Sequence, residues 1–197
     1  MKERDIRAEY DEQDITVYQA YGPTIAIPAI ENNNFVSPPF KMTRMTWVKP
    51  SFLWMMYRSG WASKEGQEHI LKIRIKREGF EWALKHSCIS HFDKGIYNSV
   101  EEWQSIKERS PVRIQWDPER DLSLTSLKHR AIQIGLSGIA VEKYVNEWIV
   151  SIEDITDFSK KVHRLFTNGD LEKAKSMLPI EETYFLNDLL KKTIGAD

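Results

Sequence analysis

One stretch of the chain mixes aromatic and cationic side chains in a way that suits a nucleotide. Residues 44–67 read RMTWVKPSFLWMMYRSGWASKEGQ. Tryptophan rings can stack on a base, and Arg and Lys side chains can hold phosphate groups. The residues of this mixture are Arg44, Trp47, Lys49, Trp54, Arg58, Trp61 and Lys64. The alternative interpretation is a core helix with salt bridges, whose Arg and Lys side chains reach solvent along their apolar stems.

A second polar group follows a predicted strand. Residues 115–121 read QWDPERD and crowd acidic and cationic side chains around a proline turn. A turn at the end of a strand can aim side chains into a cleft. Glu119 is therefore a candidate to orient a sugar hydroxyl or to act as a general base. The alternative is a solvated turn in which Glu119 pairs with Arg120.

The motifs of several other enzyme classes are missing. The 5 histidines show no HxH or HExxH spacing, and the chain has no P-loop, no G-x-S-x-G elbow and no dinucleotide-binding GxGxxG. The single cysteine, Cys88, excludes an intramolecular disulfide and a cysteine-rich zinc site. We therefore expect no metal ion.

Charge and hydropathy set further limits. The 197 residues include 28 Lys and Arg against 29 Asp and Glu, so the balance does not argue for non-specific nucleic-acid binding, although a local basic cleft is compatible with it. No apolar run reaches transmembrane length, and the first residues, MKERDIRAEYDEQD, are unlike a signal peptide. These features predict a cytoplasmic protein with no membrane partner.

A helix after Pro50 must position the aromatic and cationic residues. Proline is tolerated in the first turn of a helix, and Gly60 suits its end. Phe52, Met55 and Met56 share one stripe at helical spacing. We therefore expect a buried helix from Pro50 to about residue 59.

Strands and helices are both predicted around this central helix. The predicted strands are 15–21, 69–75, 112–121, which runs into a turn at Asp117-Pro118, and 129–138, with a short one in 149–156. The predicted helices are a short piece after residue 27, 77–87, 99–110, 139–149, two within 158–179, and 181–193.

This order of elements predicts an α+β fold. We expect a single domain over 1–197 with a mostly antiparallel sheet, a buried central helix and a helical C-terminal third. Residues 1–14 would form an N-terminal arm, with a short amphipathic turn docked on the body. Residues 150–197 would form a helical segment packed on the body.

Several segments resemble the family catalogued as domain of unknown function 4291. They read ITVYQAYGPTIA, RMTWVKPSFLWMMYRSGWASKEGQE, IKREGFEWAL, IQWDPERD, RAIQIGL and a late LP. The resemblance spans nearly the whole chain. It implies no mechanism, because the name of the family records only that its function is unknown.

Two segments are also similar in layout to ADP-ribosyltransferases. VYQAYGPTIAIPAIENNNF resembles their first strand and helix, and KPSFLWMMY resembles a motif with a serine and aromatic residues beside the nicotinamide pocket. This resemblance places Tyr18 at the family's tyrosine and Gln19 where its histidine belongs. It matches Ser51 and Tyr57 to the second motif and makes Glu119 the candidate for the late glutamate.

The chain departs from that pattern at two places. Gln19 replaces the histidine, and Ala20-Tyr21 replaces a small Gly-Thr pair. Glu119 follows its predicted strand, whereas the family's glutamate opens one.

Three functions follow from these observations. The first is an ADP-ribosyltransferase-like protein that binds NAD in a cleft as substrate and transfers ADP-ribose to an unknown protein or nucleic-acid acceptor. The resemblance implies Glu119, Tyr57 and Gln19 as catalytic residues, and adds Tyr18 and Ser51 to the ligand-binding set. The second is a non-catalytic module that binds a nucleotide or single-stranded nucleic acid. The third is a structural protein.

The positions of a few side chains distinguish these functions. The enzyme requires Tyr18, Tyr57 and Glu119 to face one pocket. The binding module requires an open basic groove, and the structural protein requires neither.

Overall fold

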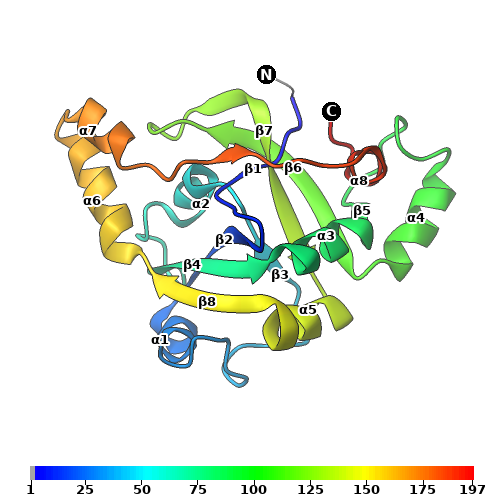
Figure 1. Ribbon diagram of the computed structural model, residues 1–197, viewed down its shortest axis with the longest axis horizontal. Coiled ribbons are helices and arrows are strands. Elements are labelled where there is room, and N and C mark those ends of the chain that lie inside the picture. Colours follow the sequence, from blue (N-terminus) through cyan, green and yellow to red (C-terminus); the bar gives the residue numbers. More distant parts are fainter. Residues whose placement is uncertain (1–2) are drawn as a thin grey trace.

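Two β-sheets form the centre of the structure, a computed structural model that describes residues 3–197. The first sheet is antiparallel, with the order β2 (Asp14–Tyr21), β4 (His69–Lys76), β8 (Ile149–Asp154). The second has the order β3 (Thr46–Val48), β7 (Ser126–Leu136), β6 (Val112–Arg120), β5 (Ser87–Ile89), and only its β5–β6 pair is parallel. Helices surround both sheets (Figure 1), so the predicted α+β class is confirmed.

The two sheets meet at one backbone bridge. The amide of Tyr18 donates to the carbonyl oxygen of Lys49 at 2.7 Å, and the amide of Lys49 donates to the carbonyl oxygen of Tyr18 at 3.2 Å. Within residues 3–197, no other backbone pairing joins the sheets. Polar side chains from β2 and β3 therefore meet beside this bridge. We call the junction of the two sheets at this bridge the seam.

Helix α2 (Phe52–Ser59) packs beside the seam. Ser51 caps its first turn, because the Ser51 hydroxyl accepts a hydrogen bond from the Trp54 amide at 3.1 Å. Gly60 ends it in the left-handed conformation, with φ of 60°. Phe52 and Met55 are buried, as predicted, in a core that also contains Val162 from α6.

The other helices lie at the periphery. In Figure 1, α6 (Thr156–Thr167) and α7 (Leu171–Ser176) lie at one end of the molecule, and α4 (Val100–Arg109) and α8 (Asp188–Ile194) at the other. The remaining helical elements are α1 (Pro23–Glu31), α3 (Arg77–Lys85), α5 (Ile139–Lys143) and the π-helix η1 (Tyr144–Trp148). None of the helices among the described residues has the length and apolar character needed to span a bilayer.

Two prolines behave differently from the prediction. The short helix expected after residue 27 instead begins at Pro23 and contains Pro28, which removes only one backbone donor from the helix. The prediction of a turn at Asp117-Pro118 is also wrong. Strand β6 runs through Pro118 to Arg120 because a bulge between these two residues accommodates the missing N–H, and the chain turns at 121–125.

The two ends of the described chain pair with each other. The helix predicted over 181–193 is wrong in its first half, where β9 (Glu182–Thr183) pairs with β1 (Arg7–Ala8). Asn187 then caps α8 by accepting from the Leu190 amide at 2.9 Å. The amphipathic turn predicted in 1–14 is likewise replaced by β1, and its residues 1–2 lie outside the described part of the chain. These pairings join segments far apart in sequence, so local patterns do not reveal them.

Candidate functional site

A cavity of about 470 Å³ opens beside the seam. Its wall is formed by the end of β2, the segment 39–49, the side of α2, the turn at 65–67, and one glutamine each from β6 and β7. Gln115 and Gln133 are directly opposite each other in the β6–β7 pair. The cavity thus collects residues from both sheets and from α2.

The wall of this cavity is rich in positive charge. Among the described residues it contains the cations Lys41, Arg44, Lys49 and Arg58, and one carboxylate, Glu65. Within residues 3–197, the side chains of Arg44 and Arg58 form no ion pair and no hydrogen bond. An anionic ligand would complement both the charge and the unused donors of these guanidinium groups.

Lys49 is the buried cation of the cavity. It is only 6% exposed, and its Nζ lies 5.6 Å from the centre of the Trp54 ring. Its polar contact is a long hydrogen bond of 3.4 Å to the carbonyl oxygen of Trp47. Burial, together with the positive charge of the nearby Arg58, lowers the pKa of Lys49 to about 7, and Asp117 opposes the shift. A large fraction of this amine is therefore neutral at physiological pH.

Two glutamines and an aspartate form a polar group on β6 and β7. Nε2 of Gln115 donates to Oδ1 of Asp117 at 3.0 Å, and Nε2 of Gln133 donates to Oδ2 of the same carboxylate. Within the described chain, the side-chain oxygen Oε1 of each glutamine accepts no hydrogen bond. Both amides line the cavity and can therefore hydrogen-bond a ligand there.

Gln19 lines the cavity, but its amide is already bonded within the protein. Its Nε2 lies 2.7 Å from Oγ1 of Thr46, 3.1 Å from the carbonyl oxygen of Trp47 and 3.0 Å from the Tyr21 hydroxyl. Its Oε1 accepts from the Tyr144 hydroxyl at 2.8 Å. Gln19 thus ties β2 to β3 and η1 across the seam.

Tyr18 and Trp54 lie outside the cavity wall. Tyr18 is fully buried in the core beneath α2, with its ring centre 5.7 Å from that of Phe52. Trp54 is buried beside Tyr57, with ring centres 6.1 Å apart. The Tyr18 hydroxyl and the Trp54 indole N–H make no hydrogen bond within residues 3–197. Of the two rings, that of Trp54 contacts a wall residue, Lys49.

Ser51 and Glu119 form a separate group at the first turn of α2. The Ser51 hydroxyl donates to Oε1 of Glu119 at 2.9 Å, and the Arg120 amide donates to the same oxygen at 2.8 Å. Burial raises the pKa of Glu119. Glu181 joins this group, where it accepts a hydrogen bond from the Phe52 amide at 2.7 Å. None of the three polar side chains lines the cavity.

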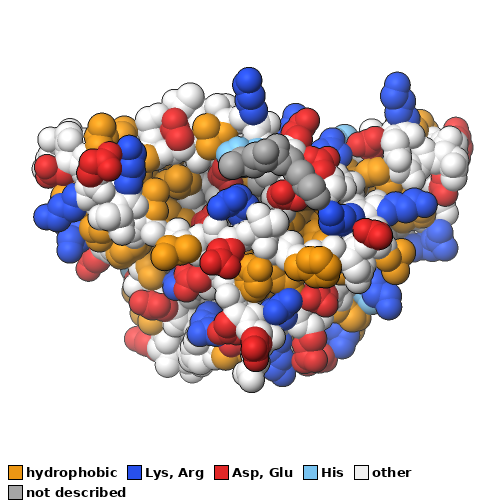
Figure 2. Space-filling view, turned by 45° about the horizontal axis from the view of Figure 1, so that its top comes forward, with side chains coloured by type: hydrophobic (Ala, Val, Ile, Leu, Met, Phe, Trp, Pro, Cys, Tyr) orange, Lys and Arg blue, Asp and Glu red, His pale blue; other side chains and the backbone are white. Residues whose placement is uncertain are grey.

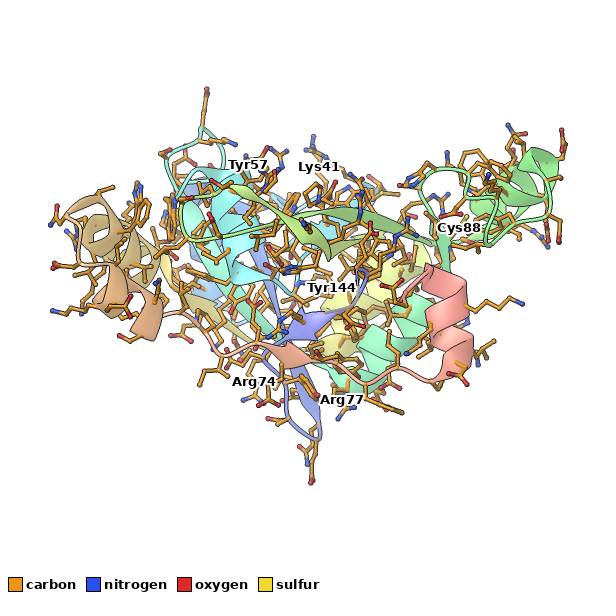
Figure 3. All side chains as sticks on the ribbon, turned by 90° about the horizontal axis from the view of Figure 1, so that it is seen from above. Lys41, Tyr57, Arg74, Arg77, Cys88 and Tyr144 are labelled. Atoms are coloured by element: carbon orange, nitrogen blue, oxygen red, sulfur yellow. The ribbon has the colours of Figure 1, made fainter. Side chains whose placement is uncertain are left out.

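Tyr57 and Lys64 are the remaining candidates from the sequence. Tyr57 is 39% exposed, and the Arg120 guanidinium lies 3.6 Å from its ring centre. Lys64 donates to the carbonyl oxygen of Arg58 at 2.8 Å, at the end of α2. Figure 3 places Tyr57 on the same side of the molecule as Lys41, away from Arg74 and Arg77. Neither Tyr57 nor Lys64 lines the cavity.

The structure therefore divides the candidates that the sequence singled out. Those that line the cavity are Gln19, Arg44, Trp47, Lys49 and Arg58. Those that lie elsewhere are Tyr18, Ser51, Trp54, Tyr57, Lys64, Glu119 and Trp61, whose ring is buried and stacks on that of His163. The arrangement that the enzyme hypothesis requires, with Tyr18, Tyr57 and Glu119 facing one pocket, is not present at this cavity.

Sequence reasoning did not identify Gln133 or Lys41 as wall residues. Gln133 interrupts the apolar run of RAIQIGL, which is a usable signal, because a polar side chain inside a buried strand requires a partner. The hydrogen-bond partner of Gln133 is Asp117. The sequence does not reveal this pair, because it depends on the strand register that places Gln133 opposite Gln115. Lys41 carries no comparable signal in the sequence.

Comparison with known proteins identifies a family without a described activity. A family model described as "Domain of unknown function (DUF4291)" matches residues 5–184. No curated protein and no solved structure matches the chain. The resemblance to ADP-ribosyltransferases thus receives no support from these comparisons. Because the family model covers most of the sequence, the chain belongs to the DUF4291 family.

Proposed function

We propose that the cavity binds a nucleotide, with Arg44 and Arg58 on its phosphate groups. The observation that carries this proposal is the pair of guanidinium groups that line one cavity and have no ion pair or hydrogen bond within residues 3–197. Arg is well suited to phosphate because its planar donors can form two parallel hydrogen bonds. Lys41 adds a further positive charge to the same wall.

Trp47 supplies an aromatic surface for the base. It lies directly opposite Gly135 in the β3–β7 pair, and a Cβ atom at Gly135 would lie only 2.9 Å from the indole. The missing side chain therefore lets the ring rest against strand β7. A ring held in this way can stack on a base with little loss of conformational entropy.

Gln115 and Gln133 supply polar recognition. A glutamine amide presents both donors and an acceptor, which matches the edge of a base or a ribose hydroxyl. Asp117 fixes the two amides by accepting a hydrogen bond from each of them. The cavity of about 470 Å³ lies in the usual range of small-molecule sites.

A mononucleotide or a dinucleotide such as NAD suits the site better than a nucleic-acid strand. Four cations, Lys41, Arg44, Lys49 and Arg58, line this one cavity. On the one face that Figure 2 shows, Lys and Arg side chains are interspersed with Asp and Glu. Binding of a strand depends on a positive groove that follows the backbone.

Thermal unfolding and calorimetry with adenosine, ADP and NAD test this proposal. ADP and NAD should raise the melting temperature, because they bind only the folded protein, and adenosine should do so less. Arg44→Gln and Arg58→Gln should each weaken ADP binding about tenfold or more, through loss of a charge-assisted hydrogen bond.

Lys64→Gln is the matched control for these variants. It removes a cation that lies near α2 but outside the cavity wall, so it should leave ADP binding unchanged. The absence of any shift with ADP and NAD would overturn the proposal. Equal ADP affinity in wild type, Arg44→Gln and Arg58→Gln would also overturn it.

A further inference from the structure

The Lys49 amine is placed differently from the other cations of the cavity. Arg44 and Arg58 carry charge at any physiological pH, because a guanidinium does not lose its proton. Lys49 lies within the protein, with no carboxylate close enough to form an ion pair in residues 3–197. A buried ammonium without such a partner is costly, so the neutral amine is the favoured state.

The backbone of Lys49 is fixed on both sides. Its amide and carbonyl groups form the bridge to Tyr18, and the residue that follows leads into α2. Its side chain extends beside the Trp54 ring and lines the cavity. The amine is therefore held at a defined position in the proposed nucleotide site, as a nucleophile requires.

We propose that Lys49 forms an imine with the aldehyde of a nucleotide that carries a free reducing sugar, a class to which ADP-ribose belongs. This proposal rests on the proposed function, because Arg44 and Arg58 would hold the phosphates of the same ligand. It adds a covalent step and a substrate class. Such a ligand has an aldehyde in its ring-opened form, which ADP lacks.

The step balances without an oxidant or a reductant. The lone pair of the neutral Lys49 amine attacks the aldehyde carbon, and a proton moves from the nitrogen to the carbonyl oxygen to give a neutral carbinolamine. The carbinolamine then loses its hydroxyl group with a proton as water, and the C=N bond forms. Asp117, whose charge acts on Lys49, stabilises the protonated imine.

Other nucleophiles of the chain do not meet these conditions. Cys88 is buried elsewhere, with its Sγ 3.3 Å from the Tyr97 hydroxyl. Lys41 lines the cavity but is exposed, so its ammonium is not desolvated. Lys41 is therefore an internal control for reaction with a bound aldehyde.

Trapping with cyanoborohydride tests the proposal. The protein is incubated near pH 7 with ADP-ribose and cyanoborohydride, which reduces an imine to a stable amine, and the modified lysines are identified by peptide mass spectrometry. Lys49 should be modified at least about tenfold faster than Lys41 or Lys64, since near neutral pH its neutral fraction is far larger than that of an ordinary lysine. An excess of ADP should block this modification.

Two variants and a pH series complete the test. Lys49→Met removes the nucleophile with a side chain of similar volume, so it should abolish the specific adduct in a protein that remains folded. Arg58→Gln should slow labelling by lowering ligand occupancy. In wild type the Lys49 rate should reach its half-maximum near pH 7.

The outcomes separate this proposal from the binding proposal. If ADP and ADP-ribose stabilise the protein and Lys49 remains unmodified, the imine proposal is overturned and nucleotide binding stands. Modification of Lys41, Lys64 and Lys49 at equal rates also overturns it. If no nucleotide stabilises the protein and Lys49 still reacts selectively with a simple aldehyde, the binding proposal fails and the reactive amine is supported.

Discussion

Two groups of titratable side chains lie near the start of α2, and they differ in where their hydrogen-bond partners come from. Glu119 and Glu181 lie at the first turn of the helix, where Ser51 and the Phe52 and Arg120 amides donate hydrogen bonds to them. Lys49 lies beside the cavity and has one long hydrogen bond.

This difference in hydrogen-bond partners indicates which group has a structural role. The carboxylates use donors that belong to the fold, so their role is complete within the protein. Lys49, Arg44 and Arg58, which form no ion pair within residues 3–197, line a cavity that a ligand can fill. A buried or concave group without internal partners is thus the stronger indicator of a functional site.

Lys49→Met should give the largest change, and it should act on the pH dependence of stability. Burial lowers the pKa of Lys49 from 10.5 to about 7, so between these values the unfolded chain binds more protons than the folded protein. The free energy of unfolding of wild type therefore rises with pH over this window, by roughly 5 kcal/mol. Lys49→Met should remove this rise and stabilise the protein most below pH 7.

Denaturant unfolding of both proteins from below pH 7 to pH 10.5 measures this effect. Methionine fills a similar volume without a charge, so packing changes should be small. Parallel stability curves for wild type and Lys49→Met would show that the amine is not desolvated.

Glu181→Gln should produce a slope of the opposite sign. Burial raises the pKa of Glu181 from 4.5 to about 8, so the folded protein binds more protons than the unfolded chain between these values. The free energy of unfolding of wild type should fall as the pH rises through this window, by about 2 kcal/mol because the residue is partly exposed. Glu181→Gln should remove the fall and stabilise the protein most above pH 8.

The amide oxygen of the variant can still accept from the Phe52 amide, so the capping interaction is retained. Potentiometric or NMR titration of the Glu181 carboxyl gives an independent check. An ordinary pKa for that group would contradict this prediction.

Ser51→Ala should have a moderate effect on stability. It removes the cap of α2 and one donor to Glu119, and losing such a cap typically costs about 1 to 2 kcal/mol. ADP affinity at temperatures where the variant is folded should remain that of wild type, because Ser51 lies outside the cavity wall. A large loss of ADP affinity in the folded variant would contradict this prediction and would indicate that Ser51 belongs to the ligand-binding site.

Glu119→Gln should have the smallest effect. Glutamine retains the acceptor for Ser51 and Arg120, and we expect a stability change of at most about 1 kcal/mol. ADP and NAD affinity should be unchanged. Release of nicotinamide from NAD by wild type, and its loss in Glu119→Gln, would restore the ADP-ribosyltransferase hypothesis.

The sequence predicted the elements whose signals are local. The apolar stripe between Pro50 and Gly60 predicted a buried helix, and α2 is that helix. Strands β2 and β4 follow from β-branched and alternating residues at 14–21 and 69–76. These patterns succeed because burial of one face and capping act over a few residues.

Features that depend on long-range pairing could not be predicted in the same way. The pairing of Glu182 with Ala8 turns a helical pattern into a strand, and the bulge after Pro118 moves Glu119 away from the cavity. The opposition of Gln115 and Gln133 depends on strand register. None of these can be read from one segment of the chain.

The bridge between Tyr18 and Lys49 also allows ligand binding in the cavity to be detected by hydrogen exchange. Among the described residues it is the one place where backbone groups of the two sheets exchange hydrogen bonds, and both of its amides are therefore protected only while the sheets stay joined. Hydrogen exchange at these two amides measures the free energy of opening the seam. A ligand that contacts Gln19 and Arg44 on one side and Gln133 on the other should slow this exchange, so occupancy of the cavity can be followed without a labelled ligand.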